Sequence, residues 1–280
     1  MLKQKKFLTM ASPVSQSVTQ VDAFTNRPFA GNPAAVCVSQ TPLAPEIMQQ
    51  IAAEMNLSET AFVSPLEENS FSLRWFTPAA EIDLCGHATL ASAHVLWSED
   101  YLDPATAVRF QTRSGELRAT QDEEMIQLDF PSTPVSATEA PATLIEALGS
   151  PETAYVGSNG KDYLVEVRSQ LETLVPDFEK LAQIPCQGVI VTAPGQPPYD
   201  FASRYFAPAI GIPEDPVTGS AHCALGPYWQ AKLRREQMLA YQASHRGGIV
   251  RVRCTPERIY LGGQAVTVMQ GTLRLPRPGQ

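Results

Sequence analysis

The order of apolar and polar residues predicts that the first part of the chain is rich in β-strands. Strict alternation, or a short apolar run rich in β-branched and aromatic residues, is typical of a strand. Such patterns occur at 18–24, 32–38, 61–63, 71–76, 108–112, 116–120 and 125–130. We therefore expect a sheet that takes up most of the chain as far as residue 130.

Helical periodicity appears at a few places between these strands. Residues 45–56 place their apolar side chains on one face, as in an amphipathic helix, whereas 85–97 is apolar nearly all round. A helix without a polar face is enclosed by its own domain. The rest of the chain repeats this mixture, with helices predicted at 142–148 and 219–233, strands at 162–167, 187–192 and 199–206, and four or five final strands.

A short motif occurs once in each half of the chain. Residues 74–79 read Arg-Trp-Phe-Thr-Pro-Ala, and residues 204–209 read Arg-Tyr-Phe-Ala-Pro-Ala. Each copy precedes an acid-containing loop and a glycine, Gly86 or Gly219, that opens an apolar helix. Two unrelated strand ends are one interpretation, but we favour the duplication of one unit. Duplication places both helix N-termini near the domain junction, where their N–H groups and dipoles can hold a small carboxylate.

The length of the chain indicates two domains. A chain of 280 residues exceeds what one hydrophobic core usually serves. The proline-bounded polar stretch 131–141 is the best boundary. We expect an N-terminal lobe at 18–131 and a C-terminal lobe at 132–280, whose last strands can pack back on the first lobe. Residues 1–17 are interpreted as a loose leader.

Composition argues against several classes of protein. Lys and Arg number 21 against 29 Asp and Glu, which gives a net charge of −8, and a negative surface repels nucleic acids. The uncharged runs contain prolines or fall short of the about 20 residues that span a membrane. The 5 cysteines lack C-x-x-C spacing, which argues against zinc ribbons and disulfide frameworks and favours the cytoplasm.

Glu59 is the first candidate for chemistry. It lies between the end of the 45–56 helix and the apolar run 61–63. One interpretation is a solvated turn residue. The other is a carboxylate that its apolar flanks draw inward, which raises its pKa and suits a proton shuttle near neutral pH.

His87, Ser220 and Asp215 are further candidates. His87 follows Gly86 in the first turn of the apolar helix, and Ser220 takes the mirrored position in the second half. One interpretation is that each residue caps its helix or lies in the core. The other is that His87 and Ser220 form a pair that holds a polar substrate. Asp215 precedes the second apolar helix, where a helix cap and a catalytic partner are equally good interpretations.

Other kinds of site have little residue support. His87 and His94, even joined by His222 or Cys223, have no partner at i+3 or i+4, so we expect no metal. The chain lacks the phosphate loop of nucleotide-binding proteins and the glycine fingerprint of dinucleotide-binding ones. Ser220 does not lie in the G-x-S-x-G elbow of hydrolases.

Four ordered motifs, however, resemble those of the PhzF family, the phenazine-biosynthesis isomerase-like proteins. They are Asp22-Ala-Phe-Thr-Asn-Arg-Pro-Phe-Ala-Gly-Asn-Pro-Ala-Ala-Val36, Asn56-Leu-Ser-Glu-Thr-Ala-Phe62, Leu84-Cys-Gly-His-Ala-Thr-Leu-Ala91 and Gly211-Ile-Pro-Glu-Asp-Pro-Val-Thr-Gly-Ser-Ala-His-Cys223. The segment 242–248 is similar as well. The resemblance runs from about residue 18 to the end and is more specific for the family than for a substrate.

The resemblance implies an α+β, diaminopimelate-epimerase-like fold: two pseudo-symmetric domains, each a mixed β-sheet wrapped around a central apolar helix, with the active site between them. It also implies a homodimer and a cofactor-independent isomerase in which a glutamate moves a proton between carbons. That glutamate falls on Glu59, and supporting catalytic roles fall on His87 and Asp215. The substrate-binding positions that it implies are Asn32, Gly86, Thr218, Gly219 and Ser220.

Related racemases and epimerases use one thiol from each domain. Here the first thiol position is Cys85 and its mirror is Thr218. A threonine hydroxyl is far too weak an acid to replace a thiolate, so two-thiol epimerisation is disfavoured. We interpret Cys85 as a packing residue.

Three functions stay open at this point. The leading one is a cofactor-independent isomerase that acts on a small carboxylic acid, with Glu59 as the acid and base. The second is a racemase or epimerase in which Glu59 replaces one thiol. The third is a non-catalytic interaction protein that has kept the fold.

Overall fold

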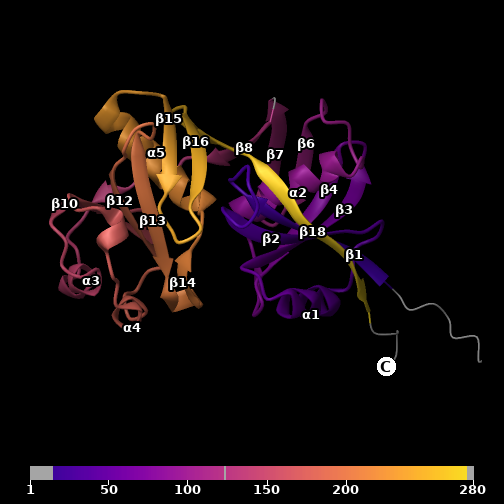
Figure 1. Ribbon diagram of the computed structural model, residues 1–280, viewed down its shortest axis with the longest axis horizontal. Helices are drawn as coiled ribbons and strands as arrows, with labels where there is room; N and C mark the ends of the chain where they lie inside the picture. Colours follow the sequence, from indigo (N-terminus) through magenta and orange to yellow (C-terminus); the bar gives the residue numbers. More distant parts are fainter. Residues whose placement is uncertain (1–14, 123, 276–280) are drawn as a thin grey trace, which may run out of the picture.

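The computed structural model describes residues 15–122 and 124–275, which form two halves side by side along the long axis (Figure 1). The elements of the first half are β1 (Ser15–Ala23), β2 (Asn32–Val38), α1 (Pro45–Met55), β3 (Glu59–Glu67), β4 (Ser70–Phe76), β5 (Glu81–Ile82), α2 (Gly86–Ser98), β6 (Val108–Thr112), β7 (Gly115–Asp122) and β8 (Met125–Pro131). The elements that follow are β9 (Ser136–Ala137), α3 (Ala142–Ala147), β10 (Thr153–Ser158), β11 (Asp162–Val167), η1 (Leu171–Thr173), α4 (Phe178–Leu181), β12 (Gly188–Pro194), β13 (Phe201–Ala207), η2 (Pro208–Ile210), β14 (Ile212–Asp215), α5 (Gly219–Leu233), β15 (Gln237–Gln242), β16 (Gly248–Cys254), β17 (Arg258–Gly263) and β18 (Ala265–Arg274).

The same order of strand pairing occurs in both halves. In the first half β1 pairs antiparallel with β2, β2 parallel with β3, β3 antiparallel with β4, and β4 parallel with β6. In the second half β10, β11, β12, β13 and β15 repeat these four pairings in the same senses. The repetition supports the duplication that the sequence motif predicts.

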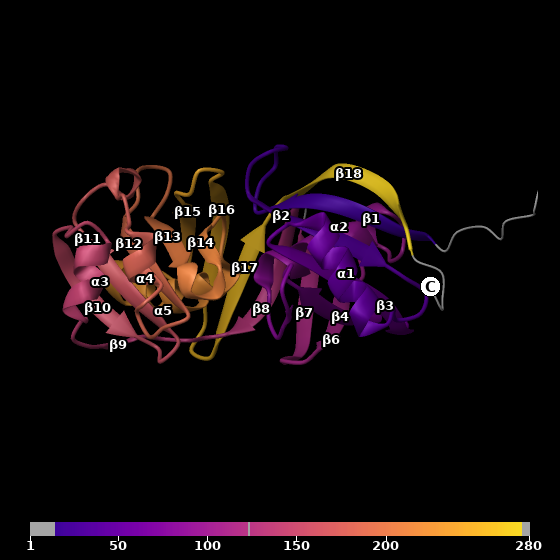
Figure 2. The same cartoon turned by 90° about the horizontal axis from the view of Figure 1, so that it is seen from below.

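Two strands join the halves into one continuous sheet. β17 pairs with β8, and β18 crosses to the first half, where it pairs with β1 from Ser15–Arg274 to Ala23–Ala265. Figures 1 and 2 show β18 running across the first half beside β1. Because β1 begins at Ser15, residues 15–17 are part of the sheet and not of a leader; residues 1–14 lie outside the described residues.

The apolar helix of each half packs against strands. α2 contacts β1, β2, β3, β8 and β18, and all but two of its residues are buried. α5 contacts β16 and β17 and contains Pro227. Since Pro227 has no N–H, Cys223 O lacks its usual helical donor and accepts instead from the backbone N of Thr133, at 3.1 Å, in the segment that links the halves.

The four predicted helices and the predicted strands are confirmed with small shifts at their ends, except that the strand predicted at 61–63 is longer and spans Glu59–Glu67. The elements that the pattern does not reveal are short: β5 and β9 have two residues each, β14 and α4 have four, and β10 includes a glycine. So few residues carry no measurable periodicity. Among the described residues, no helix combines the length and apolarity that crossing a membrane requires.

Candidate active site

The N-termini of α2 and α5 meet where the two halves join. A methyl group at Gly86 would lie 3.1 Å from Gly219 Cα, and one at Gly219 would lie 3.2 Å from Gly86 Cα. A side chain at either position would be in tight contact with the facing backbone, which would have to shift by a few tenths of an ångström. The first N–H groups of a helix have no partner within it, and here two such sets lie next to each other.

The repeated motif holds the loops that lead to these N-termini. Arg74 donates to Glu81 of β5 through Nε at 2.7 Å and Nη2 at 2.8 Å. Arg204 makes the same two-pronged pair with Glu214 of β14, at 2.7 and 2.9 Å. The acid in each loop is therefore structural, because it fixes the strand that directly precedes the glycine-led helix.

Glu59 and His87 face each other in the buried centre of the site. Glu59 is the first residue of β3, and His87 is in the first turn of α2. Glu59 Oε2 lies 3.0 Å from His87 Nε2, and both side chains are less than a tenth exposed. That oxygen nevertheless makes no hydrogen bond of ordinary geometry. The two side chains are within ion-pair distance, but their geometry is not that of a hydrogen bond. Glu59 Oε2 is therefore a buried acceptor that can take a hydrogen bond from a further donor.

Asn32 connects His87 to the second half. Its Nδ2 lies 3.0 Å from His87 Nδ1 and donates to Asp215 Oδ1 at 2.8 Å and to Val217 O at 2.9 Å. The side chain is fully buried, and its Oδ1 has no hydrogen-bond partner among the described residues. Asn32 thus crosses the junction and adds a second unpaired acceptor to the site.

Asp215 is held from its own half by Thr218 and Gln242. Thr218 Oγ1 donates to Asp215 Oδ2 at 2.5 Å. Gln242 Oε1 accepts from Thr218 N at 2.8 Å, while its Nε2 donates to Asp215 O at 2.7 Å. Sequence reasoning did not single out Gln242, although it begins the 242–248 segment that resembles the family.

The buried environment shifts the acidity of these groups. Burial raises the pKa of Asp215 to about 6, and the charge of His87 and the hydrogen bonds from Thr218 and Asn32 only partly oppose this. Burial alone would lower the pKa of His87, but its neighbours Cys85 and Glu59 raise it well above its usual value. The site therefore holds a carboxyl that titrates near neutral pH beside a histidine that favours its charged form.

Cys85 completes the buried cluster as the residue before α2. Its Sγ lies 3.5 Å from His87 Nδ1, and burial, with the charge of Glu59, raises its pKa to about 11. It is therefore a thiol near neutral pH, and the negative charge that acts on His87 there comes from Glu59. Ligand atoms of Glu59, Cys85 and His87 lie within 4.8 Å of one another, close enough for a metal ion, although the protonated thiol is a poor ligand.

Ser220 stands apart from the cluster. It is exposed in the first turn of α5, whereas its mirror His87 is buried. The structure thus brings Asn32, Glu59, His87 and Asp215 into contact through their side chains, and Gly86 and Gly219 through their backbones. Ser220 lies at the solvent side of the same helix N-terminus.

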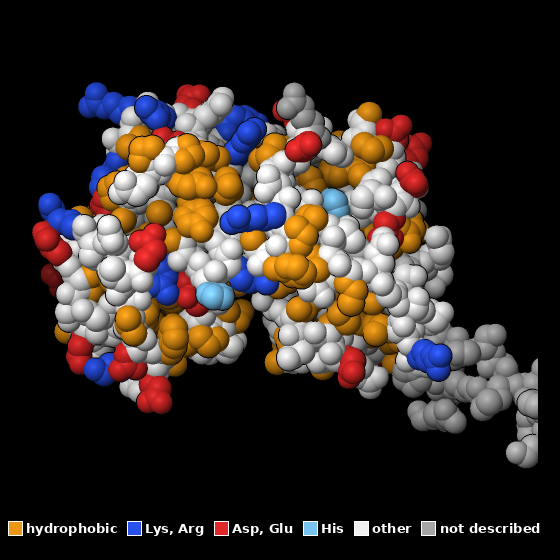
Figure 3. Space-filling view, viewed as in Figure 1, with side chains coloured by type: hydrophobic (Ala, Val, Ile, Leu, Met, Phe, Trp, Pro, Cys, Tyr) orange, Lys and Arg blue, Asp and Glu red, His pale blue; other side chains and the backbone are white. Residues whose placement is uncertain are grey.

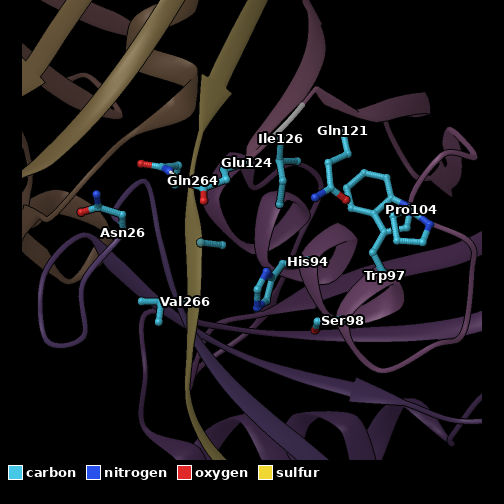
Figure 4. Close-up of a pocket in the computed structure, with 11 residues that line it drawn as sticks. Asn26, His94, Trp97, Ser98, Pro104, Gln121, Glu124, Ile126, Gln264 and Val266 are labelled. Carbon is cyan, nitrogen blue, oxygen red and sulfur yellow. Dashed lines mark hydrogen bonds between the residues drawn. The ribbon is translucent and has the colours of Figure 1, made fainter.

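Two cavities lie outside this cluster. One, of about 340 Å³, is lined by His94 and Trp97 of α2, Glu124, Ile126 and Gln264, among others (Figure 4). The other, of about 680 Å³, is lined by residues of both halves. Neither is lined by Glu59, His87 or Asp215, so both cavities are separate from the cluster.

Comparison with known proteins assigns the family. The family model described as phenazine biosynthesis-like protein matches residues 21–271. A Halalkalibacterium halodurans protein named an uncharacterized isomerase is 53% identical over 259 residues, which cover 91% of this chain and 97% of that protein.

Solved structures agree with this match. A PhzF-family phenazine biosynthesis protein from Enterococcus faecalis is 41% identical, with a TM-score of 0.89, and the match covers 94% of this chain and all of that one. A predicted epimerase from Pseudomonas aeruginosa, 22% identical with a TM-score of 0.71 and coverage of 93% and 100%, shares the fold. The chain has the PhzF and epimerase-like fold, with a mixed sheet and few helices, and it belongs to the phenazine biosynthesis-like (PhzF) family.

Proposed function

We propose that the protein is a cofactor-independent isomerase that moves a proton on a small carboxylic acid, with Glu59 as the acid and base. The observation that carries the proposal is the state of Glu59: a buried carboxylate 3.0 Å from His87 Nε2 whose Oε2 has no hydrogen bond of ordinary geometry. Such an oxygen can take a proton from carbon without giving up a hydrogen bond of ordinary geometry. The chain's relative named an isomerase supports the reaction class.

In this proposal the two helix N-termini hold the substrate. The first-turn N–H groups of α2 and α5 converge at the contact of Gly86 with Gly219, where their dipoles favour a carboxylate. The exposed Ser220 hydroxyl would contact the substrate from the solvent side. Thr218 would act indirectly, through its hydrogen bond to Asp215.

His87, Asn32 and Asp215 would then organise the proton transfer. A charged His87 stabilises the Glu59 carboxylate before transfer and any negative charge that forms on the substrate. The Asn32 amide donates to Asp215, and the pKa of Asp215 near 6 lets it gain or lose a proton at working pH. The unpaired oxygens of Asn32 and Glu59 would accept from hydroxyl or amino groups of the substrate.

No metal or cofactor enters this scheme, and we propose a homodimer in the cytoplasm.

The test is Glu59→Gln. Hydroxy- and amino-carboxylates that raise the melting temperature would be incubated with enzyme in D₂O, and proton exchange at carbon followed by NMR. General acid–base catalysis contributes about 10²–10⁴ in rate, so Glu59→Gln should lose at least 100-fold of the exchange while it keeps ligand binding. Glu67→Gln, at an exposed position of the same strand, is the matched control. Exchange at the wild-type rate in Glu59→Gln would remove Glu59 from its role.

The same measurement separates the two other functions. A racemase or epimerase in which Glu59 replaces one thiol is the second candidate, and the Cys85 thiol, beside His87, is the other group near Glu59. Loss of chirality at a single exchanging centre would support it, whereas a proton that reappears on a different carbon supports the isomerase. Saturable binding without exchange would indicate the non-catalytic interaction protein.

A further inference from the structure

The cavity of about 680 Å³ lies between the two halves and is a different place from the Glu59 cluster. Residues 24–27, Ala30 and Met125 line it from the first half, and Tyr199, Tyr241 and residues 246–249 line it from the second. Its volume falls within the range of ligand sites, about 300–1,000 Å³. In Figure 3, basic side chains lie along the boundary between the halves on the face shown.

The charge of the lining is one-sided. Arg27, Arg246 and Arg251 line the cavity, and no Asp or Glu does. Arg246 is paired with Asp22, but the guanidinium groups of Arg27 and Arg251, both exposed, have no ion-pair or hydrogen-bond partner within residues 15–122 and 124–275. The whole chain carries a charge of −8, so two unpaired arginines at one cavity favour an anionic ligand there.

Another part of the wall is made of two tyrosines and two aliphatic residues. The rings of Tyr199 and Tyr241 stack at 5.0 Å between centroids and 24° between planes. Leu239 and Ile249 also line the cavity. Gly247 makes room for the ring of Tyr241, because a methyl group there would lie 2.2 Å from the tyrosine oxygen. Stacked rings with aliphatic neighbours suit a planar, partly apolar ligand.

We propose that this cavity binds a planar organic anion, with its carboxylate between Arg27 and Arg251 and its ring beside the stacked pair of Tyr199 and Tyr241. Arginine supplies the fork of donors that a carboxylate accepts, and the tyrosine pair supplies the surface for the ring. This site goes beyond the proposed function, because it uses none of Glu59, His87 or Asp215.

Benzoate is a suitable probe, with benzamide as its neutral counterpart and acetate as the carboxylate without a ring. Calorimetric titration of the full chain should show saturable benzoate binding that weakens as salt rises. Arg27→Gln/Arg251→Gln should weaken it about tenfold or more, since hydrogen bonds between charged groups are lost. The single variants should fall between, and none should lose the fold, because neither side chain has a partner to lose.

One control locates the ligand. Arg118→Gln removes an exposed arginine of β7 that does not line the cavity and should leave the affinity for benzoate unchanged. The proposal is overturned if no saturable binding is seen, if benzamide or acetate binds as well as benzoate, or if the Arg27 and Arg251 variants bind benzoate as tightly as the wild type.

Discussion

At the scale of single residues, the site is built from polar groups that are buried before any ligand arrives. Asp215 is about nine-tenths enclosed and is held by two short hydrogen bonds. Hydrogen bonds to the charged form normally keep a carboxyl acidic. Here the effect of burial on the pKa of Asp215 is larger than that of the hydrogen bonds, because the pKa still rises to about 6. Ionisation of Asp215 therefore lowers the stability of the folded chain.

That cost makes stability depend on pH. The pKa of Asp215 rises from 3.8 to about 6 on folding, so the folded chain holds this proton more tightly, by about 3 kcal/mol. The stabilisation is fully present below pH 3.8 and is lost as the pH rises through about 6. Asp215→Asn stays neutral and should be more stable than the wild type above pH 7, by up to about 3 kcal/mol, with the difference shrinking toward pH 4.

Urea unfolding between pH 4 and 8 measures the difference in stability between Asp215→Asn and the wild type. Asp83→Asn, whose side chain is 76% exposed, is the control and should show little change. An Asp215→Asn variant whose stability relative to wild type does not vary with pH would contradict the assignment. Exchange activity should fall in this variant even where the fold is more stable.

At the scale of elements, α2 and α5 meet through glycines rather than side chains. A methyl group at Gly86 would approach the backbone of Gly219, which cannot rotate away as a side chain would. Gly86→Ala and Gly219→Ala should each lower the free energy of unfolding by about 1–3 kcal/mol, as overpacking does. The double variant should depart from additivity, because the two methyl groups would occupy the same space.

Gly271→Ala in β18 is the matched control. Its added methyl group would lie 3.9 Å from Val18, an ordinary contact, so stability should stay the same or rise slightly. Chemical denaturation of the four variants decides the point. If Gly86→Ala and Gly219→Ala unfold like the wild type, the helix N-termini are farther apart than described.

The elements were largely predictable from the sequence, whereas the side-chain contacts between them were not. Alternation and helical periodicity are local properties, and they locate α2 and most strands because burial within each element is regular. The hydrogen bond from Asn32 to Asp215 joins residues 183 positions apart, and no local sequence pattern predicts it. The motif that contains Asn32 indicated a binding residue, but its role as a bridge follows only from the packing of the two halves.

At the scale of the whole molecule, main-chain bonds and the pair of Arg246 with Asp22 join the halves beside the site. Gly31 N donates to Gly247 O at 2.8 Å, and Ile249 N donates to Phe24 O at 3.0 Å. Arg246 donates to the carbonyl of Gly31 and to Asp22, each at 2.8 Å. Since Gly31 directly precedes Asn32, the same contacts that close the junction also place the bridging amide.

Arg246→Met should therefore loosen the junction as well as destabilise the chain. Asp22 is 1% exposed, and an acid left buried without its partner costs about 3 kcal/mol, less here because Arg246 is partly exposed. Amide exchange at Gly31 and Ile249 should quicken more than in the rest of the sheet, because their acceptors lie across the junction. Arg235→Met, which breaks an exposed pair with Asp200, should cost at most about 1 kcal/mol. A uniform rise in exchange over both halves would show that Arg246 supports the fold as a whole and not the junction that positions Asn32.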